Sequence, residues 1–385
     1  MSLLTQPSEQ LTVRAGGRVF GGWTGVSVSA SLETVARTFS LTAAARWPQE
    51  SHLLRLRPGS EVSVYIGADK VITGWLDKVE GSFSKDSHTL SITGRSKTSD
   101  LVDCDPTGVT SFRRKDALAI TRALAASYSV DVVQAGSWDI TSKLRRFAVN
   151  DQEKAAAAIQ RLGELGAFLV TDDAQGRLVL WREAYQYASV ALKVGVNILA
   201  GTVSVDVSQR FSTYQVRSYR QGDDDDFGDV LQASEEATDS GDLGRERLLK
   251  LPIEKGEDKA RTRQRAQWEA STRYGQSIQA KYTVQGWRQT PGGALWEPGL
   301  LVTVEDSFNG VDGEFLVVDV DLTLDGSGGS IVQMTLAPPE GYELLPPMKP
   351  RKRRGKRKPV KSAFSVLAFG VQLPSKEDTQ QGGQQ

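Results

Sequence analysis

The sequence has few of the residues that most catalytic and metal centres need. It contains one cysteine, Cys104, and two histidines, His52 and His88, in 385 residues. One cysteine cannot form an intramolecular disulfide or a cysteine cage for a metal, and neither histidine lies in a ligand pattern such as HExxH. The GxSxG nucleophile elbow and the GxxxxGK phosphate loop are also missing from the sequence. We therefore expect no catalytic residues, no metal site and no cofactor.

Long apolar segments are missing as well. The closest candidate, YASVALKVGVNILAG at 187–201, is interrupted by Lys193 and alternates as strands do. It does not approach the roughly 18 to 20 apolar residues of a membrane-spanning helix. The first ten residues, MSLLTQPSEQ, have neither the basic nor the apolar region of a signal peptide. These features predict a protein that is made in the cytoplasm and has no membrane span.

Charge is balanced in total but unevenly distributed. The 47 basic and 47 acidic residues cancel, yet the segment from Lys349 to the end carries about +8 and the preceding residues about −8. A basic cluster at 351–361 accounts for most of this excess and could bind phosphates. No aromatic residue is interleaved for stacking on bases, so we favour docking on an acidic surface of a partner protein. The cluster contains Arg351, Lys352, Arg353, Arg354, Lys356, Arg357, Lys358 and Lys361.

The cluster is followed by a short apolar segment, SAFSVLAFGV at 362–371. Its apolar residues Phe364, Val366, Leu367 and Phe369 are typical of a docking peptide that adds to a partner's surface. We predict a basic, flexible C-terminal tail over 341–385.

The 37 glycines and the repeated alternation of apolar and polar residues indicate a mainly β fold. Short strands with Gly-rich breaks fill residues 10–97, with Val79, Phe83, Leu90 and Ile92 expected to point inward. This density of short strands predicts a small β-barrel or sandwich.

A change to helical periodicity marks an α+β domain at 98–185. One helix is expected at 115–128, with Leu118, Thr121, Ala125 and Tyr128 on one face. A second is expected at 150–166, where Asn and Asp occupy the capping positions. The segments AFLVTD and RLVLWR then predict a hairpin around DAQG.

The β pattern resumes at Gly201. The acidic stretch 222–244, which contains DDDDFGD, is predicted to be a solvated loop. A helix is expected at 256–274, ended by Gly275, and four strands follow.

Two halves of the chain resemble each other. PGSEVSV at 58–64 matches PGLLVTV at 298–304, and the following alternating runs match in the same order. Two alternating strands after a Pro-Gly turn can resemble each other by chance, which is the alternative interpretation. The alignment places Val62 and Val64 on Val302 and Val304, Val79 and Phe83 on Val320 and Leu324, Leu90 and Ile92 on Met334 and Leu336, and Gly25 on Thr202.

The repeat predicts two related small β-barrels that flank the α+β domain. In chain order we expect an N-terminal arm at 1–9, a first barrel at 10–97, the α+β domain at 98–185, a second barrel at 186–340 with an insertion at 221–275, and the tail at 341–385.

Three segments in this order resemble one protein family. They are TVRAGGRVFGGWTGVSVSASLE, YTVQGWRQTPGGALWEPGLLVTVED and GEFLVVDVDLTLDGSGGSIVQMTLAPPEGY. Together they are similar to the baseplate hub protein of contractile-tailed bacteriophages, the Mu-type tail protein P family, over residues 10–342. The resemblance implies a trimeric ring between the tail tube and the membrane-piercing spike, in which two barrels per subunit give quasi-sixfold symmetry. It brings no catalytic residues.

The resemblance also implies the partners. These are two further copies of the chain, the tail spike protein, the tail tube or distal tail protein, other baseplate proteins and, transiently, phage DNA in the lumen, all within the virion. As trimer contacts we name Trp23, Trp75, Trp287 and Trp296, because tryptophan is enriched at buried anchors; an ordinary place in the core is the alternative for each. Two other functions stay open, a nucleic-acid-binding protein acting through 351–361 and a cell-wall hydrolase.

Overall fold

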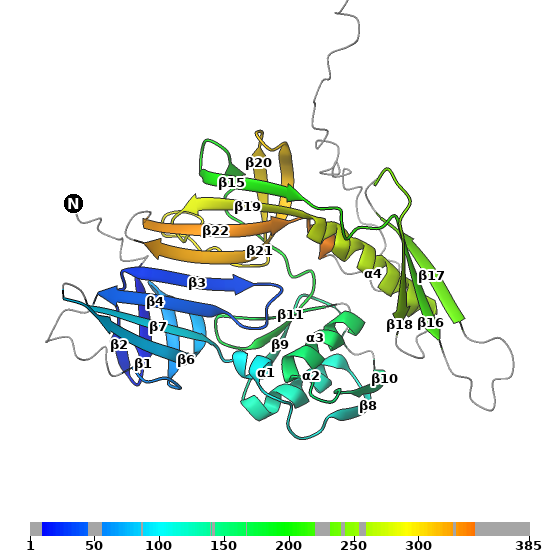
Figure 1. Ribbon diagram of the computed structural model, residues 1–385, viewed down its shortest axis with the longest axis horizontal. Helices are drawn as coiled ribbons and strands as arrows, with labels where there is room; N and C mark the ends of the chain where they lie inside the picture. Colours follow the sequence, from blue (N-terminus) through cyan, green and yellow to red (C-terminus); the bar gives the residue numbers. More distant parts are fainter. Residues whose placement is uncertain are drawn as a thin grey trace, which may run out of the picture.

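The computed structural model describes residues 10–44, 56–85, 88–138, 140, 143–166, 168–219, 232–239, 243–253, 259–325 and 329–342. The expected class is confirmed, since the protein is mainly β and carries an α+β unit. One sheet of fourteen strands forms the body of the molecule, in the order β15-β19-β22-β21-β3-β4-β7-β6-β5-β1-β2, with β13, β14 and β20 beside this path (Figure 1).

The first half of the sheet alternates buried and exposed residues, which gives each strand one core face. It consists of β1 (Leu11–Ala15), β2 (Arg18–Phe20), β3 (Gly25–Ser31), β4 (Thr38–Ala44), β5 (Glu61–Ile66), β6 (Asp69–Phe83) and β7 (His88–Ser96). The inward positions predicted for Leu90 and Ile92 are confirmed, and Val79 packs against the same core. Phe83 does not, because it lies at the exposed end of β6.

The second half repeats the order of the first. It consists of β13 (Gln186–Tyr187), β14 (Leu192–Lys193), β15 (Ile198–Val205), β19 (Ile278–Gln285), β20 (Leu300–Asp306), β21 (Val311–Asp325) and β22 (Gly329–Ala337), followed by a short 3-10 turn, η4 (Pro339–Gly341). The run β15-β19-β22-β21-β20 has the same connectivity as β3-β4-β7-β6-β5. The two halves are therefore two copies of one arrangement.

The details of the repeat go beyond strand order. Strands β6 and β21 each have 15 residues, and β7 and β22 each have nine. The register shifts between Leu76 and Lys78 in β6, and between Val317 and Asp319 in β21, at the same distance before Val79 and Val320. A bulge at an equivalent place in both copies is a designed feature of the fold.

The closed barrels that we expected are not found in the described residues. Instead, β3 of the first half pairs antiparallel with β21 of the second, which joins the halves edge to edge in one sheet. The sequence could not reveal this junction, because alternation reports which face of a strand is buried and not which strand lies beside it.

Two parts of the sequence alignment are also wrong by two residues. Val79 lies opposite Ile92 and Val320 opposite Met334, so Ile92 corresponds to Met334 and not to Leu336. Thr202 corresponds to Ser27 and not to Gly25, because these two residues hold the same place in the rows of paired residues across each half. The counterpart of β4 is β19, and segment 213–219, into which the match of Gly25 with Thr202 continues, belongs to another sheet.

The α+β unit packs its helices on a small sheet, with its own core around Leu101, Ile120, Leu124, Ile159 and Leu162. Asp116 caps α2 by accepting a hydrogen bond from the Ala119 N–H at 2.8 Å. The helix α3 begins at Ala155, five residues later than predicted, because 150–154 form a turn. The unit contains α1 (Ser99–Asp103), β8 (Ser111–Lys115), α2 (Ala117–Ala125), η3 (Ala126–Tyr128), β9 (Val132–Ala135), β10 (Leu144–Ala148), α3 (Ala155–Gly166), β11 (Leu169–Asp172) and β12 (Leu178–Trp181).

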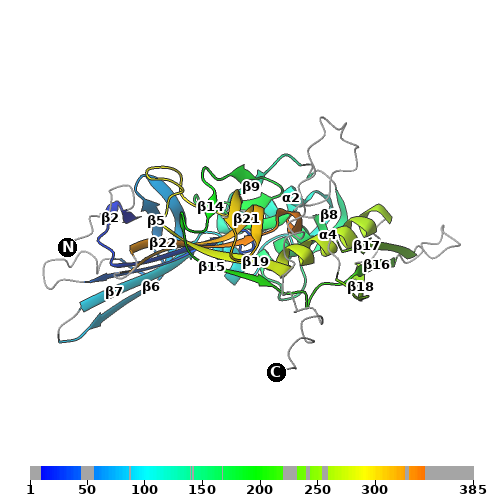
Figure 2. The same cartoon turned by 90° about the horizontal axis from the view of Figure 1, so that it is seen from above.

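A three-stranded sheet covered by one long helix is inserted between β15 and β19. It consists of β16 (Thr213–Tyr219), β17 (Gln232–Thr238), β18 (Leu248–Ile253) and α4 (Lys259–Ser277). Part of the stretch predicted to be a solvated loop is therefore strand β17, and residues 223–229 lie outside the described residues. Seen from above, this unit and the β6–β7 hairpin extend at opposite ends of the molecule (Figure 2).

Gly275 does not end α4, as we expected, but lies inside it. The helix continues to Ser277, and Gly275 meets Gly341 of η4 backbone to backbone. A Cβ atom on Gly275 would lie 2.4 Å from the Gly341 Cα atom. The glycine is needed for this close approach and not for termination of the helix.

We predict that Gly275→Ala lowers the free energy of unfolding by about 1–3 kcal/mol, because the added methyl group forces α4 and η4 apart. Gln276→Ala, at an exposed position on the same helix, is the control and should change stability by less than about 0.5 kcal/mol. Urea denaturation of both variants measures the difference. Equal stabilities would show that the helix and the turn do not constrain each other.

Candidate assembly site

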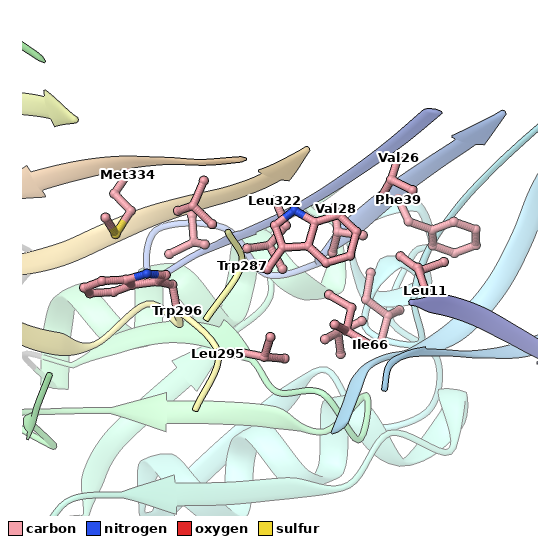
Figure 3. Close-up of a cluster of buried hydrophobic side chains, with 14 of the residues drawn as sticks. Leu11, Val26, Val28, Phe39, Ile66, Trp287, Leu295, Trp296, Leu322 and Met334 are labelled. Atoms are coloured by element: carbon pink, nitrogen blue, oxygen red, sulfur yellow. The ribbon is translucent and has the colours of Figure 1, made fainter. Parts of the chain in front are cut away.

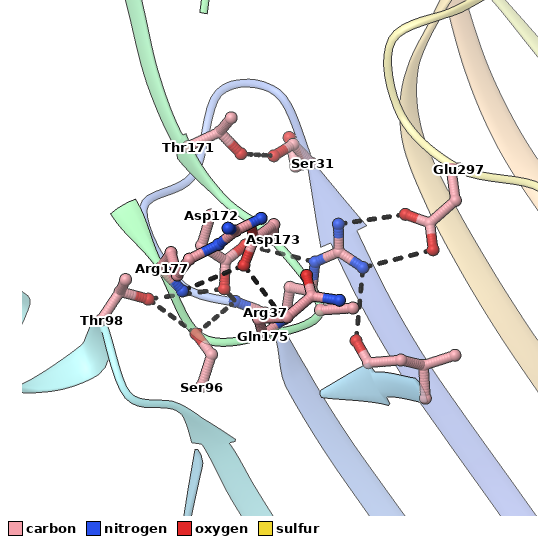
Figure 4. A network of polar contacts seen from close by, with 12 residues as sticks. Ser31, Arg37, Ser96, Thr98, Thr171, Asp172, Asp173, Gln175, Arg177 and Glu297 are labelled. Atoms are coloured by element: carbon pink, nitrogen blue, oxygen red, sulfur yellow. Dashed lines mark hydrogen bonds and ion pairs between the residues drawn. The ribbon is translucent and has the colours of Figure 1, made fainter. Parts of the chain in front are cut away.

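A buried arginine connects three parts of the chain. Arg37 follows the turn after β3, and its guanidinium reaches Asp172 at the end of β11 and Glu297 before β20 (Figure 4). The Nε–Oδ1 distance to Asp172 is 3.3 Å and the Nη2–Oε2 distance to Glu297 is 3.0 Å. Nη1 also donates to the Val71 carbonyl oxygen of β6 at 3.3 Å. We call Arg37, Asp172 and Glu297 the clasp.

Short polar contacts surround the clasp. The Arg37 backbone N–H donates to Asp172 at 3.0 Å and to the Ser96 hydroxyl at 3.1 Å. Thr171 donates to the Ser31 carbonyl oxygen at 2.7 Å, which fixes β11 beside the end of β3. These contacts tie the α+β unit to the junction of the two halves.

Burial governs the electrostatics of the clasp. Burial raises the pKa of the Asp172 carboxyl. The positive charge of Arg37 opposes this rise, and so do the hydrogen bonds that Ser96 and Arg37 donate to the carboxylate. Burial also disfavours the Arg37 cation, but the charges of Glu297 and Asp172 outweigh it and hold its pKa above the usual value. A buried charge network of this kind positions its members because leaving any of them unpaired is costly.

The clasp was not predictable from the sequence. Arg37, Asp172 and Glu297 are far apart in the chain and lie in no recognised motif. The one signal of its burial is the position of Arg37 beside strands with a strong apolar pattern.

Two edges of the main sheet have no strand beside them among the described residues. Residues 69–75 of β6 pair with β5, whereas residues 78–83 pair only with β7. In β15 the edge opposite β19 is open over residues 200–205. Figure 1 shows β15 and the β6–β7 pair at opposite borders of the same sheet. Open edges present unpaired backbone N–H and C=O groups, which favour pairing with another strand.

Exposed apolar side chains gather at both edges. Phe83, at the end of β6, is 84% exposed and is stacked on His88 of the neighbouring strand. On and before β15 the exposed residues are Val194, Val196, Leu199 and Val205. Large apolar side chains in such positions indicate contact surfaces.

The face of the sheet that points away from the core is polar and made largely of short uncharged side chains. Successive residues point to opposite faces of a strand, so the positions between the buried residues define this face. In the first half it contains Ser27, Ser29, Thr38, Ser40, Thr42, Thr89, Ser91 and Thr93. In the second it contains Thr202, Ser204, Gln279, Thr283, Thr323, Gln333 and Thr335. The charged residues on the same face are Lys78, Glu80, Arg95, Lys281 and Asp321.

The four tryptophans named from the sequence lie in different surroundings. Trp23, Trp287 and Trp296 are buried in the chain's own main core, and the indole N–H of Trp287 donates to the Thr323 carbonyl oxygen at 2.9 Å (Figure 3). The buried Trp23 indole N–H has no hydrogen-bond partner among the described residues. Trp75 is half-buried and donates to Asp100 at 3.0 Å. A role in trimer contacts stays a prediction for all four.

Other sequence-derived sites fall outside the described residues. These are His52, the basic cluster from Arg351 to Lys361 and the docking peptide from Phe364 to Phe369. In the described part of the chain no group of three or more His, Cys, Asp or Glu side chains is arranged to hold a metal ion. No helix there is long and apolar enough to cross a membrane.

Three family models match successive parts of the chain. Residues 10–96 match "Mu phage baseplate assembly protein GpP-like, N-terminal", residues 98–182 match "Baseplate hub protein gp44-like, second domain", and residues 258–345 match "Mu phage baseplate assembly protein GpP, fourth domain". The doubled sheet with its two inserted units is thus that of a phage baseplate protein, a structural component of the virion.

Whole-chain comparisons agree. The baseplate hub protein gp44 of Escherichia phage Mu is 33% identical over 359 residues, which cover 90% of this chain and 92% of that protein. The chain belongs to the family of this baseplate hub protein.

Solved structures of tail proteins have the same fold. The 43 kDa tail protein of prophage MuSo2 from Shewanella oneidensis is 28% identical with a TM-score of 0.76, covering 88% of this chain and 100% of that one. A tail protein from Neisseria meningitidis MC58 is 20% identical with a TM-score of 0.74, covering 86% and 97%.

We predict that Arg37→Met destabilises the protein by about 3–5 kcal/mol, because it leaves the Asp172 carboxylate buried without its cation. Arg95→Met is the control: Arg95 binds Asp77 and Asp103 at a partly exposed site, where the loss should be about 1 kcal/mol or less. Urea denaturation midpoints compare the two variants. Similar losses would contradict a special role for the clasp.

Proposed function

We propose that three copies of this chain form the structural hub of the baseplate, a ring that joins the sixfold tail tube to the trimeric membrane-piercing spike. The observation that carries this proposal is the doubling of the sheet, with both halves in one strand order and joined edge to edge. A trimer of such chains contains six similar halves. One side of the ring can therefore match sixfold symmetry and the other threefold symmetry.

A closed ring of three subunits requires head-to-tail interfaces, in which two different surfaces of the chain meet. The two open edges of the sheet supply two such surfaces on one subunit. A permanent ring of this kind is expected to bury more than about 2,000 Å² at each interface. The hub has no catalytic role in this proposal, because its function is to match the symmetries of the tube and the spike and to connect the two.

The ring would also let phage DNA pass during ejection. Its polar sheet face is rich in Ser, Thr and Gln. Its cations Lys78 and Arg95 are paired with acids, Glu80 and Asp77, and Lys281 is the third cation on this face. Phosphate binding by proteins depends mainly on lysine and arginine. A channel lined by this face would therefore not retain DNA. Partners at the two ends are the tail tube or distal tail protein and the spike, with other baseplate proteins around the ring.

We expect the full chain to be a trimer of about three times 41.9 kDa in multi-angle light scattering, and negative-stain images to show a ring with threefold or sixfold features. The added spike protein should bind and leave the number of subunits unchanged. A monomer at micromolar concentration, even with the spike present, would overturn the proposal.

The alternative, a nucleic-acid-binding protein that acts through 351–361, is tested by the variant that ends at residue 348. If the basic cluster is a DNA-binding element, the full chain binds duplex DNA near 150 mM salt and the shortened chain does not. Under the hub proposal, both forms assemble into trimers. DNA binding lost together with an unimpaired monomeric state would favour the alternative.

A further inference from the structure

The junction between the two halves provides a template for contacts between subunits. Across it, β21 pairs antiparallel with β3 from Asp319 opposite Ser31 to Leu324 opposite Val26. The Ser29 hydroxyl donates to Asp321 across this junction at 2.5 Å. The equivalents of these two strands in the other copy of the repeat are β6 and β15, and they carry the two open edges.

The equivalence can be fixed residue by residue from the observed pairings. In each half one row of opposed residues crosses four strands, and the positions of the bulges identify the two rows as counterparts. In the second half the row is Val320, Met334, Tyr282 and Gly201. In the first half it is Val79, Ile92, Leu41 and Val26. Gly201 therefore corresponds to Val26, and Val79 to Val320.

We infer that the open edge of β6 in one subunit pairs with the open edge of β15 in the next, in the register of the β21–β3 junction. This inference rests on the proposed trimer and specifies its contacts. The predicted pairs are Lys78 with Asp206, Val79 with Val205, Glu80 with Ser204, Gly81 with Val203, Ser82 with Thr202 and Phe83 with Gly201.

The side chains at two polar pairs suit this register. Glu80 opposite Ser204 repeats the carboxylate–hydroxyl contact of Asp321 with Ser29. Lys78, which binds Glu80 of its own strand at 2.5 Å, gains an acidic neighbour in Asp206. Opposite charges and hydroxyl pairs across strands are favourable. A shift by one residue would instead turn every side chain of β6 to the wrong face.

The apolar end of the edge also has a partner in this register. In the junction, Leu324 lies opposite Val26 and packs against the core. At the corresponding position in the open edge, Phe83 is 84% exposed and its predicted partner is a glycine. The Tyr282 ring of the neighbouring strand covers Gly201, since it lies 2.7 Å from the place of a Gly201 Cβ atom. Phe83 of the next subunit would therefore meet an aromatic ring at this position.

This pairing would close the sheet into a ring. Eight consecutive strands run from β15 to β6 in one subunit, so three subunits contribute twenty-four. At a spacing of about 4.8 Å per strand, the circumference is about 115 Å and the backbone diameter about 37 Å, more if the strands tilt. The packed cores lie on one face of this sheet, outside the ring, and the polar face lines the channel.

Cysteine pairs test the register in the full-length protein with Cys104→Ser as background. Ser82→Cys with Thr202→Cys places two thiols opposite each other between subunits, and both pair types of an antiparallel ladder bring Cα atoms to 4.5–5.5 Å, within disulfide range. Mild oxidation should give covalent dimers and trimers on a non-reducing gel. Thr323→Cys with Ser27→Cys is the matched reference, because this observed pair is intrachain and should oxidise within monomers.

The control pair is Ser82→Cys with Val203→Cys, whose side chains point to opposite faces. It should give at most a tenth of the covalent product. A trimer in light scattering with no Ser82–Thr202 disulfide, or with equal yields from both pairs, overturns this inference and leaves the trimer standing. A monomer overturns the proposed function itself.

A second measurement does not depend on disulfides. Phe83→Lys should weaken the trimer about 30-fold or more, as expected for loss of an interface anchor, while the melting temperature of the monomer stays the same because the side chain is exposed. Phe308→Lys is the control, since Phe308 is 88% exposed in the β20–β21 turn, which belongs to neither edge. Unchanged assembly of Phe83→Lys would contradict the pairing.

Discussion

The structure depends on one requirement, that a strand edge finds a partner for its backbone groups. The pairing of β3 with β21 meets it between the two copies of the repeat and makes one sheet of two halves. Without this junction the chain would hold two small sheets, each with exposed N–H and C=O groups. Among the described residues, 78–83 of β6 and 200–205 of β15 each have one edge without a partner strand. The requirement that unites the halves therefore also favours pairing between subunits.

The clasp fixes how other parts of the chain are placed against this sheet. Arg37 lies at the end of the turn between β3 and β4, directly before β4, and its guanidinium contacts both the α+β unit and the loop before β20. Edge pairing alone allows strands to slide in register. A buried arginine with two carboxylates does not, because any slip would leave a charge without a partner. Apolar packing supplies the bulk of the stability, and the clasp fixes the relative position of three parts of the chain.

Much of this architecture could be predicted from the sequence. Alternation identified the strands, and the match of PGSEVSV with PGLLVTV identified the duplication, because both are local properties. The partner of each strand edge was not predictable, and two closed barrels were expected where one open sheet is found. Gly275 was misread for a similar reason: its neighbour, Gly341, is distant in sequence. The clasp was missed because each of its three residues is an ordinary charged residue in its own segment.

The two copies of the repeat differ most in the connection between their first two strands. In the second copy this connection, from β15 to β19, holds a complete unit of three strands and a helix. In the first copy it is the short turn from Leu32 to Arg37, whose last residue belongs to the clasp. The same connection thus has different roles in the two copies. In one copy this connection is a turn that holds a buried charge contact, and in the other it carries an additional unit whose helix packs against the end of the sheet.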